Sequence, residues 1–175
     1  MMPRGGPQPT PASSPAVHPQ EFLDRSAQRL HADGAQVSSV PLPGGMAVVG
    51  QRSEFKVRWF LTTLHLYTVV AAAPQVDAAV LATFTDQALE YAVQQRKGLR
   101  GMQSGVAVIP VLAGGVVSPD AAAFASDRLV RRFAATAWPA VVDLGTGATA
   151  SHRGRVLLGG VYAGWLRART AVVLG

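Results

Sequence analysis

The chain has 175 residues, 49% of them hydrophobic and only 15% charged, with a formal net charge of +6. This length suits a single domain with a substantial core. Cysteine is absent, which excludes disulfides, cysteine-based zinc sites and thiol nucleophiles. Because charged residues are sparse, part of the apolar surface is expected to meet a partner, and self-association is expected.

The basic residues are fourteen arginines and two lysines. Arginine suits bidentate contact with phosphate or carboxylate, so an anionic partner such as nucleic acid is one interpretation. GC-rich coding, which favours Arg over Lys, is the other. Coding bias explains the kind of basic residue, but it does not explain the excess of cations over acids.

Residues 1–19 hold six of the twelve prolines and a single charge, Arg4. Such a segment buries too little apolar surface to offset its ordering entropy, so a disordered tail is predicted over residues 1–19 and one compact domain over 20–175. Residues 1–19 contain no apolar stretch of the kind found in signal peptides. The longest apolar run near the C-terminal end, 156–166, is too short to span a membrane. A cytoplasmic protein without a membrane span is expected.

The first half of the chain predicts a helix followed by strands. Apolar residues recur at helical spacing over 20–32, and Asp33-Gly34 ends that helix. A short strand is predicted over 35–40, with a turn over 41–45. Two or three strands are predicted over 46–73, with Phe55 facing inward, Glu54 facing water and Pro74 as the stop.

The second half alternates helices with strands. A helix is predicted over 76–96, a strand over 106–112, and a helix from Ser118-Pro119 to about Arg131. A strand broken at Pro139 follows over 133–143, then a turn at 145–147 and a helix over 155–169. This order predicts an α/β (mixed α+β) fold, a mixed sheet with helices on its faces.

The element order and the triplet Glu54-Phe55-Lys56 resemble the restriction-endonuclease-like fold, in particular the Mrr-type PD-(D/E)XK nucleases, over about residues 20–143. The triplet matches the E-x-K half of the family motif. The resemblance implies that Glu54 would hold Mg²⁺ and Lys56 would help to place the attacking water. The sequence departs from the family pattern at two places. The acid nearest upstream of Glu54 is Asp33, which lies in a predicted turn and not on a neighbouring strand. The strand before the long helix, where the family would carry its E-x-K, has His65 and Tyr67 instead.

His65 lies within an apolar strand, and it is the one histidine at a position that would suit a catalytic imidazole. A hydrogen-bonded core histidine is the alternative. If the protein is an enzyme, the candidate catalytic residues are Glu54, Lys56 and His65. No cofactor is expected, apart from Mg²⁺ if the protein is a nuclease.

The candidate nucleic-acid-binding residues fall into three basic groups along the chain. They are Arg96, Lys97 and Arg100; Arg128, Arg131 and Arg132; and Arg153 with Arg155, next to His152. On one face they could follow a phosphate backbone. At helix C-termini, however, cations are also favoured by the helix dipole alone.

Three functional classes follow from the sequence. The first is a non-catalytic interaction or assembly protein that self-associates, favoured by the charge-poor composition and by the lack of a catalytic constellation. The second is a nucleic-acid-binding protein on an endonuclease-like scaffold, and the third is a Mg²⁺-dependent nuclease.

Overall fold

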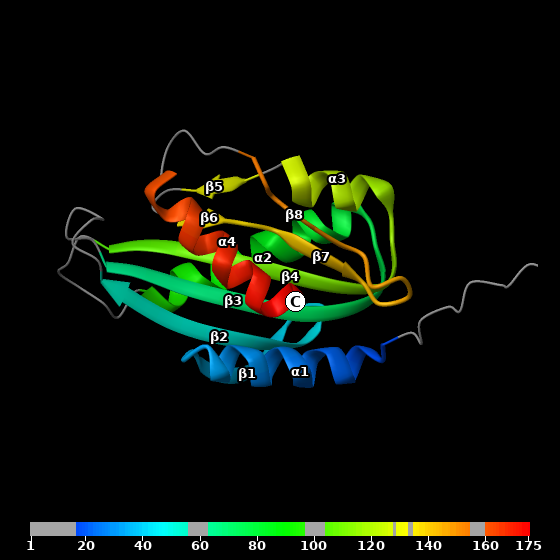
Figure 1. Cartoon of the computed structure of the whole chain (residues 1–175), viewed down its shortest axis with the longest axis horizontal. Coiled ribbons are helices and arrows are strands. Elements are labelled where there is room, and N and C mark those ends of the chain that lie inside the picture. Colours follow the sequence, from blue (N-terminus) through cyan, green and yellow to red (C-terminus); the bar gives the residue numbers. More distant parts are fainter. Residues whose placement is uncertain (1–16, 56–62, 97–103, 128, 133–134, 155–159) are drawn as a thin grey trace, which may run out of the picture.

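The structure, a computed structural model, describes residues 17–55, 63–96, 104–127, 129–132, 135–154 and 160–175. Within them the chain forms four helices around one mixed, eight-stranded sheet (Figure 1), which confirms the predicted mixed α/β class. The helices are α1 (Pro19–Ala32), α2 (Ala78–Arg96), α3 (Pro119–Asp127) and α4 (Gly160–Leu174). The strands are β1 (Gln36–Leu42), β2 (Gly45–Phe55), β3 (Thr63–Val76), β4 (Ser104–Val117), β5 (Val130–Arg132), β6 (Ala135–Ala137), β7 (Ala140–Asp143) and β8 (Thr149–Ser151).

The sheet combines an antiparallel half with a parallel half. Strands β1, β2 and β3 follow one another antiparallel, and β4 lies parallel to β3 after the crossover through α2. Strands β6 and β7 both pair with β4, and the Trp138 N–H between them donates to the Val108 carbonyl at 2.8 Å. This confirms one strand interrupted at Pro139. Strand β5 pairs antiparallel with β6, and β8 pairs antiparallel with β7.

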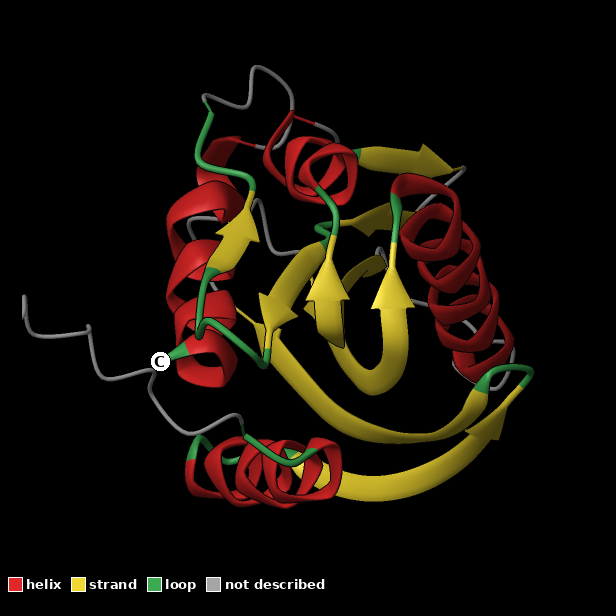
Figure 2. Cartoon of the chain, turned by 90° about the vertical axis from the view of Figure 1, so that its right-hand side faces the viewer, coloured by secondary structure: helices red, strands yellow, loops and turns green. Residues whose placement is uncertain are grey.

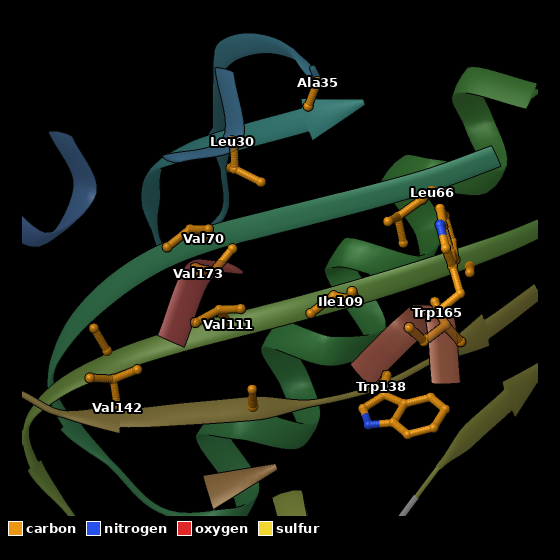
Figure 3. Close-up of a cluster of buried hydrophobic side chains, with 14 of the residues drawn as sticks. Leu30, Ala35, Leu66, Val70, Ile109, Val111, Trp138, Val142, Trp165 and Val173 are labelled. Carbon is orange, nitrogen blue, oxygen red and sulfur yellow. The ribbon is translucent and has the colours of Figure 1, made fainter. Parts of the chain in front are cut away.

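Each face of the sheet carries its own hydrophobic core. Helices α1 and α4 cover one face, α2 and α3 cover the other, and the strands curve between them (Figures 1 and 2). Alternation along β3 sends Leu64 and Leu66 to the α1/α4 face and Tyr67 and Val69 to the α2/α3 face. Figure 3 shows the first cluster, in which β3 and β4 contribute side chains between α1 and α4.

Local chemistry explains where the helices begin. Asp77 caps α2 by accepting the Val80 N–H at 2.8 Å, a signal that the sequence prediction of a start at residue 76 overlooked. Ser118 precedes α3 as predicted, and its Oγ accepts the Ala121 N–H at 3.4 Å. At the end of α1, Gly34 takes a left-handed conformation with φ of 83°, which lets the chain turn into β1.

Several predicted boundaries are wrong, and proline placement explains two of them. Strand β1 continues through Pro41, because an edge strand can direct the missing N–H away from its neighbour. Strand β3 continues past Pro74, which has no partner in the register with β4, so no ladder hydrogen bond is lost there. Helix α3 ends at Asp127, not near Arg131, and β5 follows.

At the N-terminal end, the ordered chain reaches slightly further back than predicted. The Val17 N–H donates to the Leu144 carbonyl at 3.1 Å, and α1 begins at Pro19. The rest of the predicted tail, residues 1–16, lies outside the described residues. None of the described helices is both long enough and apolar enough to cross a membrane.

Candidate functional site

The residues proposed for catalysis do not come together. Glu54 pairs with Leu64 and Ser53 pairs with His65 across β2 and β3. Side chains of paired residues share a face, so Glu54 lies on the α1/α4 face with Leu64, whereas His65 lies on the α2/α3 face. Lys56 lies outside the described residues.

His65 is buried within a row of polar side chains on β2 and β3. Its Nδ1 lies 2.7 Å from the Ser53 hydroxyl, and the neighbouring pair joins the Gln51 amide to the Tyr67 hydroxyl at 3.3 Å. Tyr67 contacts Tyr91 of α2 edge-on, with ring centroids 6.3 Å apart. Burial raises the pKa of the Tyr67 hydroxyl above its usual value. These contacts suit a hydrogen-bonded core histidine.

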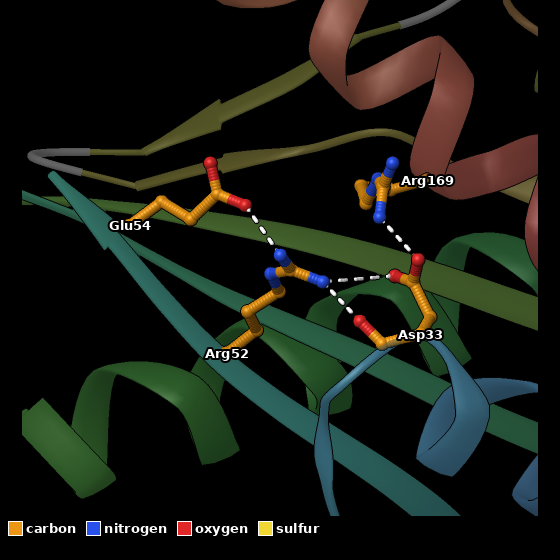
Figure 4. Close-up of polar contacts among 4 residues, drawn as sticks. All are labelled: Asp33, Arg52, Glu54 and Arg169. Atoms are coloured by element: carbon orange, nitrogen blue, oxygen red, sulfur yellow. Dashed lines mark hydrogen bonds and ion pairs between the residues drawn. The ribbon is translucent and has the colours of Figure 1, made fainter. Parts of the chain in front are cut away.

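Glu54 belongs to an ion-pair network on the opposite face (Figure 4). Its carboxylate forms an ion pair with the Arg52 guanidinium at 2.7 Å, and Arg52 also reaches the Asp33 carboxylate at 3.4 Å and the Asp33 backbone carbonyl. Arg169 of α4 pairs with the other Asp33 oxygen. All four side chains are 17–27% exposed. The network ties the end of α1 to β2 and α4.

This geometry corrects two expectations. Glu54 was expected to face water and Phe55 the core, yet the Glu54 side chain is 17% exposed and Phe55 is 53% exposed. Asp33 and Glu54 do approach each other, but Arg52 lies between their carboxylates. A cation bound by both would have to displace Arg52, and the described residues hold no cluster of three metal-ligating side chains.

Sequence reasoning overlooked Arg52 and Arg169. The signal available for Arg52 was its spacing of two residues from Glu54, because such residues share one face of a strand. Nothing comparable in the sequence pointed to Arg169, which lies 136 residues from its partner Asp33.

The structure describes only part of the three basic groups. Arg131 on β5 and Arg153 after β8 are both exposed. Arg96 lies at the end of α2 and Arg132 on β5, but their side chains, and all of Lys97, Arg100, Arg128 and Arg155, are outside what the structure describes. Their convergence on one face stays a prediction.

One feature of the fold that the site prediction did not include is the free side of β1. This seven-residue strand forms one edge of the sheet, and within the described residues it pairs with β2 alone. It carries no charged residue, and Gln36, Ser38, Ser39 and Pro41 are exposed. Edge strands of monomeric proteins usually bear charges, prolines or bulges that prevent pairing with another chain, and β1 carries Pro41 near its end but no charge.

An apolar cleft of about 300 Å³ adjoins the β1–β2 hairpin. It lies between the hairpin, the end of β3 and the first half of α2. The lining residues are Leu42, Gly44, Gly45, Ala71, Ala72, Ala73, Ala79, Val80, Thr83, Phe84, Gln87 and Leu112. Val80, which lines the cleft, is 39% exposed, so the cleft opens onto apolar surface of α2. Met46 on the same hairpin is 56% exposed, but it alternates with Ala47 and therefore lies on the other, α1/α4 face of the sheet.

No protein-family model, curated protein or solved structure matches this chain.

Proposed function

We propose that this is an assembly protein, which associates with a second copy of itself by pairing the β1 strands of the two copies into one continuous sheet. The observation that carries the proposal is the uncharged edge of β1, which pairs with β2 alone among the strands that the structure describes. Adding a strand to such an edge gives main-chain hydrogen bonds to groups that otherwise bond only to water.

The position of Pro41 indicates which backbone groups of β1 are available. Antiparallel neighbours exchange hydrogen bonds at alternate residues, and Leu42 pairs with Gly45 across the two-residue turn. Pro41, which has no N–H, is therefore at a position that does not bond to β2. By the same alternation, Val37 and Ser39 direct their N–H groups outward.

A two-fold axis at Ser39 uses all of these groups. Antiparallel pairing about this residue sets Ser39 opposite its own copy and Val37 opposite Pro41 of the other copy. Each Ser39 N–H then meets a Ser39 carbonyl, and each Val37 N–H meets a Pro41 carbonyl. The Val37 carbonyl, opposite the proline ring, gains no main-chain donor from the other copy and must bond to water. Such self-complementarity is what a symmetric dimer requires and supports a second copy over an unrelated chain.

Apolar surface next to the hairpin extends this interface beyond the backbone ladder. A stable interface buries about 1,200–2,000 Å² in total, which is more than a short ladder supplies. The cleft beside Leu42 on one face of the hairpin, and the exposed Met46 side chain on the other face, provide further apolar area at this edge. The low content of charged residues, 15% of the chain, agrees with a surface partly made for self-association.

The test is the molar mass of the full chain in solution, by light scattering after size exclusion and by sedimentation velocity over a range of concentrations. The wild-type protein is expected to dimerise. Ser39→Pro removes the central outward donor from both copies while leaving the β1–β2 ladder intact, and it is expected to give a monomer. Ser39→Ala is the matched control, since alanine keeps the outward N–H that proline removes, and it is expected to dimerise like wild type.

Two results would contradict the proposal. One is a wild-type protein that stays monomeric up to submillimolar concentration. The other is a Ser39→Pro variant that is folded by circular dichroism and dimerises as tightly as wild type, which would place the interface elsewhere.

A further inference from the structure

A second cleft, independent of the proposed dimer edge, lies between β8 and α4. It has a volume of about 530 Å³, within the usual range for small-molecule sites. Strand β8 contributes Thr149 and Ser151, the segment after it contributes Arg153, and α4 contributes Arg167 and Thr170. The buried Trp138 lies at its base.

The side chains around this cleft are mainly hydrogen-bond donors. Two guanidinium groups and the hydroxyls of Thr149 and Ser151 line it, and no aspartate or glutamate does among the described residues. The Thr170 hydroxyl donates to the Leu166 carbonyl at 3.0 Å and is already in use. Arg167 donates one hydrogen bond to the Gly154 carbonyl, at 2.5 Å, which leaves its other N–H groups available. Arg153 is exposed and has no ion pair or side-chain hydrogen bond to any other described residue.

Contacts with Trp138 and Ser126 hold the segment that carries Arg153 in place. The Trp138 indole N–H donates to the His152 carbonyl at 3.2 Å, and the His152 Nδ1–H donates to the Ser126 carbonyl at 2.8 Å. The two rings also contact edge-on at 5.3 Å between centroids. A Cβ atom at Gly154 would lie 2.8 Å from His152 Cε1, so the close return of the chain here requires glycine. The cleft is therefore formed before any ligand arrives.

We propose that this cleft binds a small organic anion through its phosphate or carboxylate oxygens, held between Arg153 and Arg167. The hydroxyls of Thr149 and Ser151 supply further donors. Guanidinium groups bind such oxyanions with charge-assisted hydrogen bonds, and two of them lining one cleft favour an anion over a neutral ligand. Trp138 is only 2% exposed and offers no face on which a base could stack, which favours a small anion over single-stranded nucleic acid.

The test is isothermal titration of the full chain, at low ionic strength, with sodium phosphate, pyrophosphate and citrate in separate experiments. Saturable binding of at least one of these anions is expected. Phosphate or pyrophosphate as the tighter ligand would identify a phosphate group, and citrate as the tighter ligand would identify carboxylates. Arg153→Ala is expected to weaken the tightest of them about tenfold or more, the loss of a charge-assisted hydrogen bond.

Arg25→Ala on α1 is the matched control, because it removes one exposed guanidinium without touching the cleft. It is expected to bind the anion as wild type does. Arg153→Ala is expected to melt at the wild-type temperature, since Arg153 holds no described contact within the fold. Arg167→Lys keeps the charge and is expected to weaken binding less than Arg167→Ala.

Three results would overturn the proposal. The first is no saturable heat from any of the three anions at millimolar concentration. The second is an equal loss from Arg153→Ala and Arg25→Ala, which would indicate only general attraction to a basic protein. The third is tighter binding of a single-stranded oligonucleotide than of the small anions, with an affinity that falls steeply with salt.

Discussion

The substitution Glu54→Gln separates a catalytic from a structural role for this carboxylate. A catalytic Glu54 predicts loss of an activity with little change in melting temperature. The observed network predicts instead a loss of stability, because Glu54 forms an ion pair with Arg52 at 2.7 Å and both side chains are mostly out of solvent, at 17% and 27% exposure. Glutamine keeps the size of the side chain but removes its charge.

The expected cost lies between two limits. Exposed ion pairs contribute about 0–1 kcal/mol, whereas breaking a buried pair costs about 3–5 kcal/mol. Because both groups keep some contact with water, we expect Glu54→Gln to lower the free energy of unfolding by about 1–2 kcal/mol. For a chain of this size that corresponds to a fall in melting temperature of about 2–8 °C.

The assay is urea denaturation of wild type, Glu54→Gln, Arg52→Met and the double variant. Arg52→Met keeps the apolar stem and removes the guanidinium, and the cycle isolates the coupling between the two side chains. We expect a coupling free energy of about 1 kcal/mol. An unchanged midpoint for Glu54→Gln, or no coupling in the cycle, would refute this account of the network.

Two further predictions test the sheet and its last turn. Gly114→Ala would place a Cβ atom 2.9 Å from both the Val116 carbonyl oxygen and Val76 Cγ2, so we expect it to lower the free energy of unfolding by about 1–3 kcal/mol in urea denaturation. Gly164→Ala, at an exposed position of α4 with open space around it, should be neutral or stabilising. Asp143 accepts the Gly145 and Thr146 N–H groups at 2.9 Å, and the Thr146 backbone hydrogen bond is the main cause that lowers its pKa. Its folded pKa is thus below the unfolded value of about 3.9, so its stabilisation is present above that pH and is lost as the pH falls through the folded pKa. Urea midpoints of wild type and Asp143→Asn should therefore converge on acidification, and a constant difference would contradict this assignment.

Much of the fold was predictable because local signals and hydrophobic periodicity agreed. Ser118-Pro119-Asp120 marked the start of α3, and the continuous apolar run from Leu64 predicted a strand covered on both faces. The interruption at Pro139 was visible for a similar reason, since a proline inside an apolar strand removes a ladder donor. In each case the residues that specify the element lie within it.

The errors occur where tertiary pairing decides the outcome. Glu54 and Phe55 follow an alternation that predicts the wrong inward side chain, because Arg52 and α1 provide the partners that make burial of Glu54 tolerable. The extension of β1 through Pro41 depends on having a neighbour on one side only. Arg52 is close to Glu54 in sequence, but Asp33, which also binds Arg52, is 19 residues away from it, and the edge position of β1 depends on the order of the whole sheet. Propensity alone could therefore not choose between the alternatives.

The same distinction explains why the two proposed sites were only partly visible in the sequence. Arg153 was among the predicted anion-binding residues, but its assignment to a basic run along the chain hid the partner that matters, Arg167 on α4, which the fold brings to the same cleft. The β1 edge was invisible for another reason: it consists of backbone groups, and its significance lies in the absence of charged side chains along the strand. If both proposals hold, the two edges of one sheet have different tasks, with β1 holding a second copy and the cleft beside β8 holding a small anion. The arginine excess would then reflect ligand binding at a defined place and not a diffuse basic surface, and Arg153→Ala against Arg25→Ala distinguishes the two.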